Sequence, residues 1–303
     1  MDKKKSIVQR EKATRYDYTI KTALDEEVDE VSYPYLEREY DDRGNLIREI
    51  SFDNAGEIQE YFEYRYDNLN RRIELKNFYN EDEMAEQVQY TYGEGDNPIS
   101  AIKIYADGSE EAISFIYDDE GRLRSRVVVN DEGEEDESEE WRYEGSHEVS
   151  YEKREYGEPV FREMQEYDEQ GKVTRVILWE GPDGKVMINK LSYDESGRRN
   201  RIEKTDEHGK VLAVIHINSF DGEEPAEIAE TTSGGTTTTR YSYDQEGRPV
   251  LQQEFSQDGT MTNEIIRTYI EEGLLKTTEV TANRRGEGMN IHYRIEYEYR
   301  FFD

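Results

Sequence analysis

Hydrophobic and polar residues alternate along much of this chain, as they do in β-strands that bury one face and expose the other. Near the C-terminus, Ile295, Tyr297 and Tyr299 alternate with charged residues. The same period of two recurs in segments 84–92 and 123–129. We therefore predict an all-β chain of short antiparallel strands.

A tyrosine-aspartate motif recurs between the strand-like segments. The pattern Tyr-Asp-x-x-Gly occurs five times, at Tyr40, Asp41 and Gly44, at Tyr117, Asp118 and Gly121, at Tyr167, Asp168 and Gly171, at Tyr193, Asp194 and Gly197, and at Tyr243, Asp244 and Gly247. Degenerate copies extend the series, so that an aromatic residue ends a unit about every 26 residues from Tyr40 to Tyr269. A weaker series of aromatic residues, such as Phe52 and Phe255, divides each unit into two strands, each followed by a turn.

The chemistry of a tight hairpin turn explains this motif. An aspartate that follows the last residue of a strand can accept hydrogen bonds from backbone N–H groups two residues later. The two variable residues suit a type I turn, and the glycine takes the next, left-handed position, which a Cβ would penalise. Each motif is therefore predicted to be a hairpin turn of four to five residues, here called a corner.

The spacing of the corners predicts the architecture. Corners and half-unit turns together predict about 20 strands in one long antiparallel hairpin ribbon over residues 33–303. A ribbon of this width is expected to twist or curl on itself. Residues 1–32 lack clear repeats and are predicted to be an N-terminal arm or cap. The terminal strands are expected to keep unpaired edges, protected from other chains by charged residues such as Glu296 and Arg300, and the oligomeric state stays open.

An acidic stretch of low complexity begins at Asn130 and ends at Glu140. Its high density of like charges favours an overlong, solvent-exposed hairpin loop. The stretch lacks the residue spacing of an EF-hand calcium loop, so no metal site is predicted there.

Charge limits the classes of partner. The 72 acidic and 39 basic residues give a formal charge of −33, which disfavours nucleic acid and anionic membrane surfaces. A basic protein partner, or simple solubility, fits this charge better. The chain has no cysteine, which removes disulfides, thiolate zinc sites and cysteine nucleophiles. It has neither a membrane-spanning apolar run nor a recognisable signal peptide, so we expect no membrane insertion and a cytoplasmic location, with export by another route left open.

The corners resemble the YD repeats of bacterial RHS proteins and related wall-associated proteins. The match is closest at Tyr117-Asp118-x-x-Gly121-Arg122-Leu123, and it extends over roughly residues 35 to 280. The resemblance implies long β-hairpin ribbons, which in large family members coil into a shell around a toxin, and it also implies carbohydrate binding. This chain is much shorter and has no evident toxin segment, so encapsulation by one chain is not expected.

Candidate contact residues come from the aromatic side chains. Common enzyme motifs are absent and the four histidines lie far apart, so we expect no enzyme and neither a cofactor nor a metal. Trp141 and Trp179 are contact candidates because tryptophan is enriched at binding hot spots. The corner tyrosines Tyr66 and Tyr92 could stack sugar rings or a partner protein. The alternative for all four is packing within the ribbon.

Three functions are consistent with these features. The first is a non-enzymatic β-repeat interaction scaffold that binds a protein partner through its extended surface. The second is a carbohydrate-binding YD-repeat module. The third is an acidic immunity or inhibitor protein for a basic toxin, whose encounter rate the negative charge would increase. The sequence leaves these alternatives open.

Overall fold

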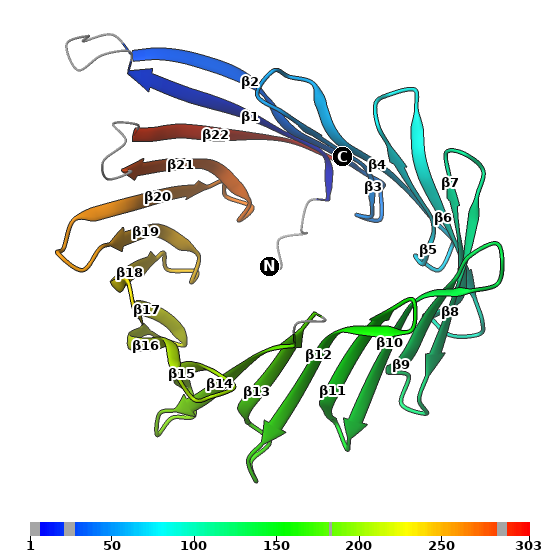
Figure 1. Cartoon of the computed structure of the whole chain (residues 1–303). Helices are drawn as coiled ribbons and strands as arrows, with labels where there is room; N and C mark the ends of the chain where they lie inside the picture. Colours follow the sequence, from blue (N-terminus) through cyan, green and yellow to red (C-terminus); the bar gives the residue numbers. More distant parts are fainter. Residues whose placement is uncertain (1–6, 21–27, 182–183, 284–289) are drawn as a thin grey trace. The chain divides into compact units, whose positions relative to one another are not determined.

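The computed structural model describes residues 7–20, 28–181, 184–283 and 290–303. Within these ranges the chain forms 22 β-strands joined by turns, and it forms no helix (Figure 1). The described residues accordingly include no helix long and apolar enough to cross a membrane. Successive strands pair antiparallel, as β3 and β4 do. The predicted all-β array of antiparallel hairpins is confirmed, with 22 strands in the described part of the chain.

The chain divides into two compact units, one of residues 1–87 with 237–303 and the other of residues 88–236. The first unit contains β1 (Val8–Ile20), β2 (Val28–Tyr40), β3 (Leu46–Phe52), β4 (Ile58–Tyr66), β5 (Arg72–Phe78), β19 (Pro249–Phe255), β20 (Met261–Tyr269), β21 (Leu275–Asn283) and β22 (Asn290–Phe301). The second unit contains β7 (Pro98–Tyr105), β8 (Glu110–Tyr117), β9 (Leu123–Val129), β10 (Glu135–Glu144), β11 (His147–Glu155), β12 (Glu158–Tyr167), β13 (Val173–Glu180), β14 (Lys185–Tyr193), β15 (Arg199–Asp206), β16 (Val211–Asp221) and β17 (Glu224–Thr232). The ranges of β6 (Met84–Tyr92) and β18 (Gly235–Tyr243) span the two boundaries.

In the first unit, the first and last strands of the chain lie side by side. Strand β1 pairs with β2 on one side and with β22 on the other (Figure 1). Strand β22 also pairs with β21, so both terminal strands have two neighbours. The expectation of unpaired terminal edges is therefore wrong. The backbone groups of both strands bond within the chain, which removes the edge that another chain could extend.

The segment predicted to be an N-terminal arm or cap contains this first strand. Residues 8–20 form β1, and Ala13 is 2% exposed between Leu36 of β2 and Tyr297 of β22. This part of the chain is thus a paired strand and not a loose arm. Residues 8–20 contain no Tyr-Asp-x-x-Gly corner, so the repeat pattern does not identify this strand. Its pairing with β22, at the other end of the sequence, is visible only in the structure.

The core of the second unit is thin and lies on one face of its strands. Side chains alternate along a strand, so Ile113 shares a face with the corner residue Tyr117. Ile113 is buried, as is Val128, which lies directly opposite it on β9. We call this side the tyrosine face and the other side the open face. Because β8 is covered on its tyrosine face alone, its open face is exposed to solvent.

The acidic stretch that begins at Asn130 is a short turn followed by a strand. The turn reaches its left-handed glycine at Gly133, and β10 begins two residues later. Arg126 of β9 forms ion pairs with both Glu137 and Glu139 of β10. The predicted overlong loop is therefore wrong. The carboxylates of Glu137 and Glu139 are compensated by cations on neighbouring strands, which a count of charges along the sequence does not include.

Candidate functional site: the corners and the open face of β7 to β10

The corner between β8 and β9 has the predicted turn chemistry. The Asp118 carboxylate accepts hydrogen bonds from the backbone N–H groups of Glu120 at 3.0 Å and Arg122 at 2.9 Å. Gly121 has a φ of 79°, in the left-handed region, and Asn70 occupies the same position of another corner with a φ of 68°. The carboxylates of Asp41, Asp168, Asp194 and Asp244 each accept the bond from the residue after the glycine.

Asp41, Asp118, Asp194 and Asp244 each have a pKa below the ordinary value of an aspartate. At Asp194, the backbone N–H of Arg198 is the largest influence, and it lowers the pKa of the carboxyl. Desolvation opposes this shift, and the Arg198 side chain, which bonds the second carboxylate oxygen at 2.9 Å, adds to it. The carboxylate therefore stays charged, and keeps the hydrogen bonds of the turn, to a lower pH than an ordinary aspartate would.

In four of the five corners a basic residue after the glycine joins the corner to the next one. Arg122 pairs with Asp118 of its own turn at 2.7 Å. Its guanidinium also lies 4.3 Å from the ring centroid of Tyr143 and donates a hydrogen bond to the carbonyl of Gly145. The aromatic residue of the next corner lies under a cation in the same way at Lys172, Arg198 and Arg248. Each such cation–π contact contributes about 0.5–2 kcal/mol.

The corner tyrosine makes a second link, to the preceding unit. The Tyr193 hydroxyl donates to the carbonyl of Val173, the first residue of β13, at 2.7 Å. Equivalent bonds to a carbonyl 19 or 20 residues earlier are made by Tyr66, Tyr117, Tyr143, Tyr167 and Tyr269. These hydroxyls provide partners for backbone carbonyls at the starts of strands.

Replacing Tyr193 by phenylalanine is expected to lower the free energy of unfolding by about 1 kcal/mol, because the half-buried carbonyl of Val173 loses its donor. Urea denaturation of both proteins measures the change. Tyr79→Phe is the matched control, since Tyr79 is exposed, and its midpoint should match that of the wild type. Equal midpoints for all three proteins would show that the hydroxyl bond adds no stability.

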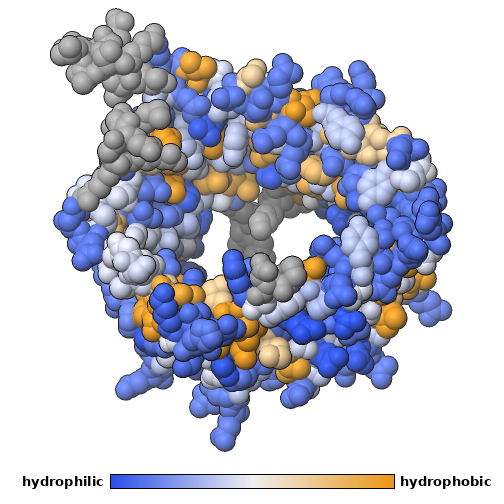
Figure 2. Space-filling model, viewed as in Figure 1, coloured by the Kyte–Doolittle hydropathy of each residue, from blue (hydrophilic) through white to orange (hydrophobic). Residues whose placement is uncertain are grey.

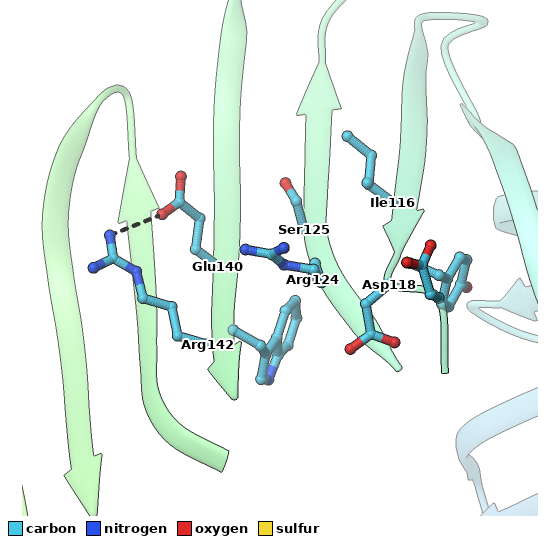
Figure 3. Close-up of a pocket in the computed structure, with 9 residues that line it drawn as sticks. Ile116, Asp118, Arg124, Ser125, Glu140 and Arg142 are labelled. Carbon is cyan, nitrogen blue, oxygen red and sulfur yellow. Dashed lines mark ion pairs between the residues drawn. The ribbon is translucent and has the colours of Figure 1, made fainter. Parts of the chain in front are cut away.

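A shallow groove lies beside the corner of β8. Its volume is about 610 Å³, and it is lined by Ile116, Tyr117, Asp118, Asp119, Arg124, Ser125, Glu140, Trp141 and Arg142 (Figure 3). Pairing of β9 with β10 ends at Ser125 and Glu140, at this groove. Glu140 and Arg142 form a loose ion pair at 3.9 Å. Among the residues that the structure describes, no cluster of three or more histidine or carboxylate side chains is arranged to hold a metal ion.

The open face next to this groove is uncharged across three strands. We define the β7–β9 patch as Ile102 of β7, Ala112, Ser114 and Ile116 of β8, and Ser125, Val127 and Val129 of β9. These residues lie in register, with Ile102 opposite Ala112 and Ala112 opposite Val129. Ile116 is 58% exposed and Ile102 44% exposed. In the view of Figure 2 most of the surface is hydrophilic, with hydrophobic areas scattered over it.

Exposed carboxylates border the β7–β9 patch. Glu135 and Glu140 of β10 lie directly opposite Val129 and Ser125, and Glu110 lies at the start of β8. The site therefore combines an apolar centre with an acidic rim, which the exposed Arg124 and Arg142 interrupt at the groove.

Comparison with known protein families agrees with the repeating corners. The family model of the teneurin YD-shell matches residues 32–134, which is 103 of the 303 residues and includes the corners at Tyr40 and Tyr117. The chain is a YD-repeat protein. Comparison with curated proteins gives no match.

Two solved structures are similar to the YD-repeat protein at low identity. A porin-like protein from Bacteroides uniformis is 10% identical over 95% of this chain and 97% of its own, with a TM-score of 0.33. A chain in the crystal structure of TcdB2-TccC3-TEV is 10% identical over 85% of this chain, with a TM-score of 0.27. The YD-repeat protein covers 18% of that chain.

The two predicted tryptophan contacts of the YD-repeat protein lie in different surroundings. Trp141 lines the groove, with its ring centroid 5.1 Å from that of Tyr151. Trp179 on β13 lies under the guanidinium of Arg162, whose central carbon is 5.3 Å from the centroid of the Trp179 ring. Both are half-buried, and only Trp141 of these two lines the groove beside the β7–β9 patch.

The two predicted tyrosine contacts are half-buried corner residues. Tyr66 bonds the carbonyl of Leu46, and Tyr92 raises the pKa of Tyr117 by a charge interaction, second to burial. Tyr66 thus has a role in linking the repeats, and binding by either tyrosine stays a prediction.

Sequence reasoning did not find the β7–β9 patch. A usable signal exists over residues 100–116, where Ile102, Ala112 and Ile116 occupy positions that should be polar on a solvated face. Recognising it requires the strand register, which assigns these positions to one side of the sheet.

Proposed function

We propose that this YD-repeat protein is a non-enzymatic scaffold that binds a protein partner through the β7–β9 patch. The proposal rests on an exposed, charge-free sheet face in a chain whose residues are 37% charged. Charged residues are depleted at the centres of protein interfaces. Covering exposed side chains such as Ile116 would contribute about 25 cal/mol per Å² of apolar surface removed from water.

The acidic rim indicates the chemistry of the partner. Glu110, Glu135 and Glu140 surround the patch, and the whole chain carries a formal charge of −33. A complementary surface has apolar side chains at its centre and lysine or arginine around them. Long-range attraction would then accelerate association and make its rate depend on salt. A basic toxin is one example of such a partner.

The hydrogen bonds and ion pairs of the carboxylates in the groove favour a binding site over a catalytic site. Two of the three carboxylates that line the groove have partners. The carboxylate of Asp118 is bonded by Arg122 and by two backbone N–H groups, and that of Glu140 faces Arg142. Carboxylates engaged in this way are poorly placed to accept or donate protons to a substrate.

Replacing Ile116 by glutamate tests the proposal. We expect the variant to fold normally, because Ile116 is largely exposed, and to lose at least tenfold in affinity for the partner. The partner is first enriched on the immobilised wild-type chain, identified by mass spectrometry, and then purified for calorimetry.

The matched control is Ile266→Glu, which changes an exposed isoleucine of β20 outside the patch. It should leave the affinity unchanged, and the association rate with the wild type should fall as salt increases. A partner that binds Ile116→Glu as well as the wild type contradicts the proposal.

Carbohydrate binding at the groove is a second candidate function. Trp141 lines the groove beside the polar side chains of Ser125 and Arg142, a combination suited to stacking and hydrogen bonding a sugar ring. A glycan array with the wild type and Trp141→Ala would test it. Glycans bound by the wild type and lost in the variant support this candidate, and no bound glycan removes it.

A further inference from the structure

The hairpin loop between β11 and β12 holds a tyrosine in an unusual backbone conformation. Glu155 pairs with Glu158, so the loop consists of Tyr156 and Gly157 alone. Both have positive φ angles, of 51° and 79°. This pair of angles is typical of a type I′ turn, for which Asn-Gly is the preferred sequence. A bulky side chain at positive φ is rare, because its Cβ crowds the backbone.

Two of the three other two-residue loops between described strands place glycine at the same position, and the third, between β17 and β18, begins with Ser233. The loop between β10 and β11 begins with Gly145 at a φ of 57°, and the loop between β16 and β17 begins with Gly222 at 61°. Among the described residues, only Asn70 and Tyr156 have positive φ without being glycine, and asparagine tolerates this region well. Tyr156 is therefore the exception, and local backbone strain of this kind is concentrated at functional sites.

The strained residue displays its side chain to solvent. Tyr156 is 78% exposed, so burial of its ring does not compensate for the backbone conformation. Its backbone N–H donates to the carbonyl of Asp136 at 2.8 Å, which fixes the loop against β10. The loop is flanked by Glu155 and Glu158, both exposed.

The loop also adjoins the β7–β9 patch. Asp136, which anchors Tyr156, follows Glu135, and Glu135 lies directly opposite Val129 of the patch. A partner that covers the Val129 end of the patch would therefore reach the loop. The loop combines an exposed aromatic ring with the exposed glutamates Glu155, which also pairs with Lys153 at 3.2 Å, and Glu158. This combination matches an apolar pocket edged by lysine or arginine.

We propose that Tyr156 is the anchor of a binding site for a basic protein partner, with its ring in a pocket of the partner and Glu155 and Glu158 paired with cations around that pocket. This inference rests on the proposed function, because it assigns the anchoring residue of the same interface. Tyrosine is enriched at such hot spots, and a fixed backbone lowers the entropy lost on binding.

Tyr156→Asn separates folding from binding. Asparagine suits the left-handed position, so the variant is expected to unfold at a higher urea concentration than the wild type. Tyr79→Asn is the matched control for loss of an exposed tyrosine elsewhere. A lower unfolding midpoint for Tyr156→Asn would mean that the tyrosine serves folding, and this would overturn the proposal.

Binding is tested with a displayed library of random 12-residue peptides, selected on the full-length wild-type chain. We expect selected peptides rich in lysine and arginine around an apolar residue. Their affinity, measured by calorimetry, should fall at least tenfold for Tyr156→Asn and for the double variant Glu155→Gln with Glu158→Gln. It should be unchanged for Tyr79→Asn.

Failure of this inference can be distinguished from failure of the proposed function. Peptides that bind Tyr156→Asn as tightly as the wild type, but lose affinity for Ile116→Glu, overturn the role of Tyr156 and leave the patch in place. Peptides that are affected by neither substitution, or a selection that enriches no peptide, overturn both.

Discussion

Replacing Ala13 by glutamate is expected to lower the free energy of unfolding by about 3–5 kcal/mol. Ala13 is 2% exposed, with Leu36 of β2 on one side and Tyr297 of β22 on the other. A longer side chain at this position overpacks the contact between the strands, and its carboxylate has no room for water. The substitution should therefore separate β1 from β22 and expose the edges of both strands.

Two measurements check this result. Urea denaturation gives the loss of stability, and light scattering coupled to size exclusion reports association of chains through the exposed edges. The matched control is Ala112→Glu, because Ala112 is an exposed alanine in a strand of the second unit. Its unfolding midpoint should stay within the error of the wild type. Equal stability of the two variants would contradict the pairing of the first and last strands.

Replacing Gly171 by alanine is expected to lower the free energy of unfolding by about 2–3 kcal/mol, roughly twice the loss from the same change at Gly121. Both glycines have a φ of 79°, so the backbone penalty is the same. A Cβ at Gly121 meets no atom within 4 Å, whereas one at Gly171 would lie 2.8 Å from Nε2 of His147. That ring lies 4.4 Å from the ring of Tyr167 and must move, which weakens their contact.

Thermal or urea unfolding of the two single variants measures this difference, and Gly121→Ala is itself the control for the backbone contribution. When both glycine substitutions are made in a His147→Ala background, they should lower the free energy of unfolding by equal amounts, because the obstructing ring is then absent. A Gly121→Ala variant as unstable as Gly171→Ala would show that the ring contact is of no consequence.

The corners could be predicted from sequence because their chemistry is local. Asp118, Gly121 and Arg122 lie within five positions of one another, and the turn bonds form between them. The fold class and the approximate number of strands followed from the same pattern. The links between corners were not predicted, because the carbonyl that Tyr193 bonds belongs to a residue 20 positions earlier. That contact depends on how successive hairpins stack.

The electrostatic interaction between side chains of β1 and β2 could not be predicted from the sequence either. Burial, followed by the nearby Glu11 carboxylate, raises the pKa of Tyr40 to about 12. Glu11 belongs to β1 and Tyr40 to β2, and their side chains meet only because these two strands pair.

The amino-acid sequence by itself determined the turns, the strands between them and the all-β class of this protein, because hydrogen bonds within five residues and a period of two specify them. Only the tertiary structure decided that β1 lies between β2 and β22, that uncharged side chains of β7, β8 and β9 gather on the open face, and that Tyr156 stands at a strained turn beside them. These features depend on strand register and on the path of the backbone over long separations, which the local pattern of residues does not encode.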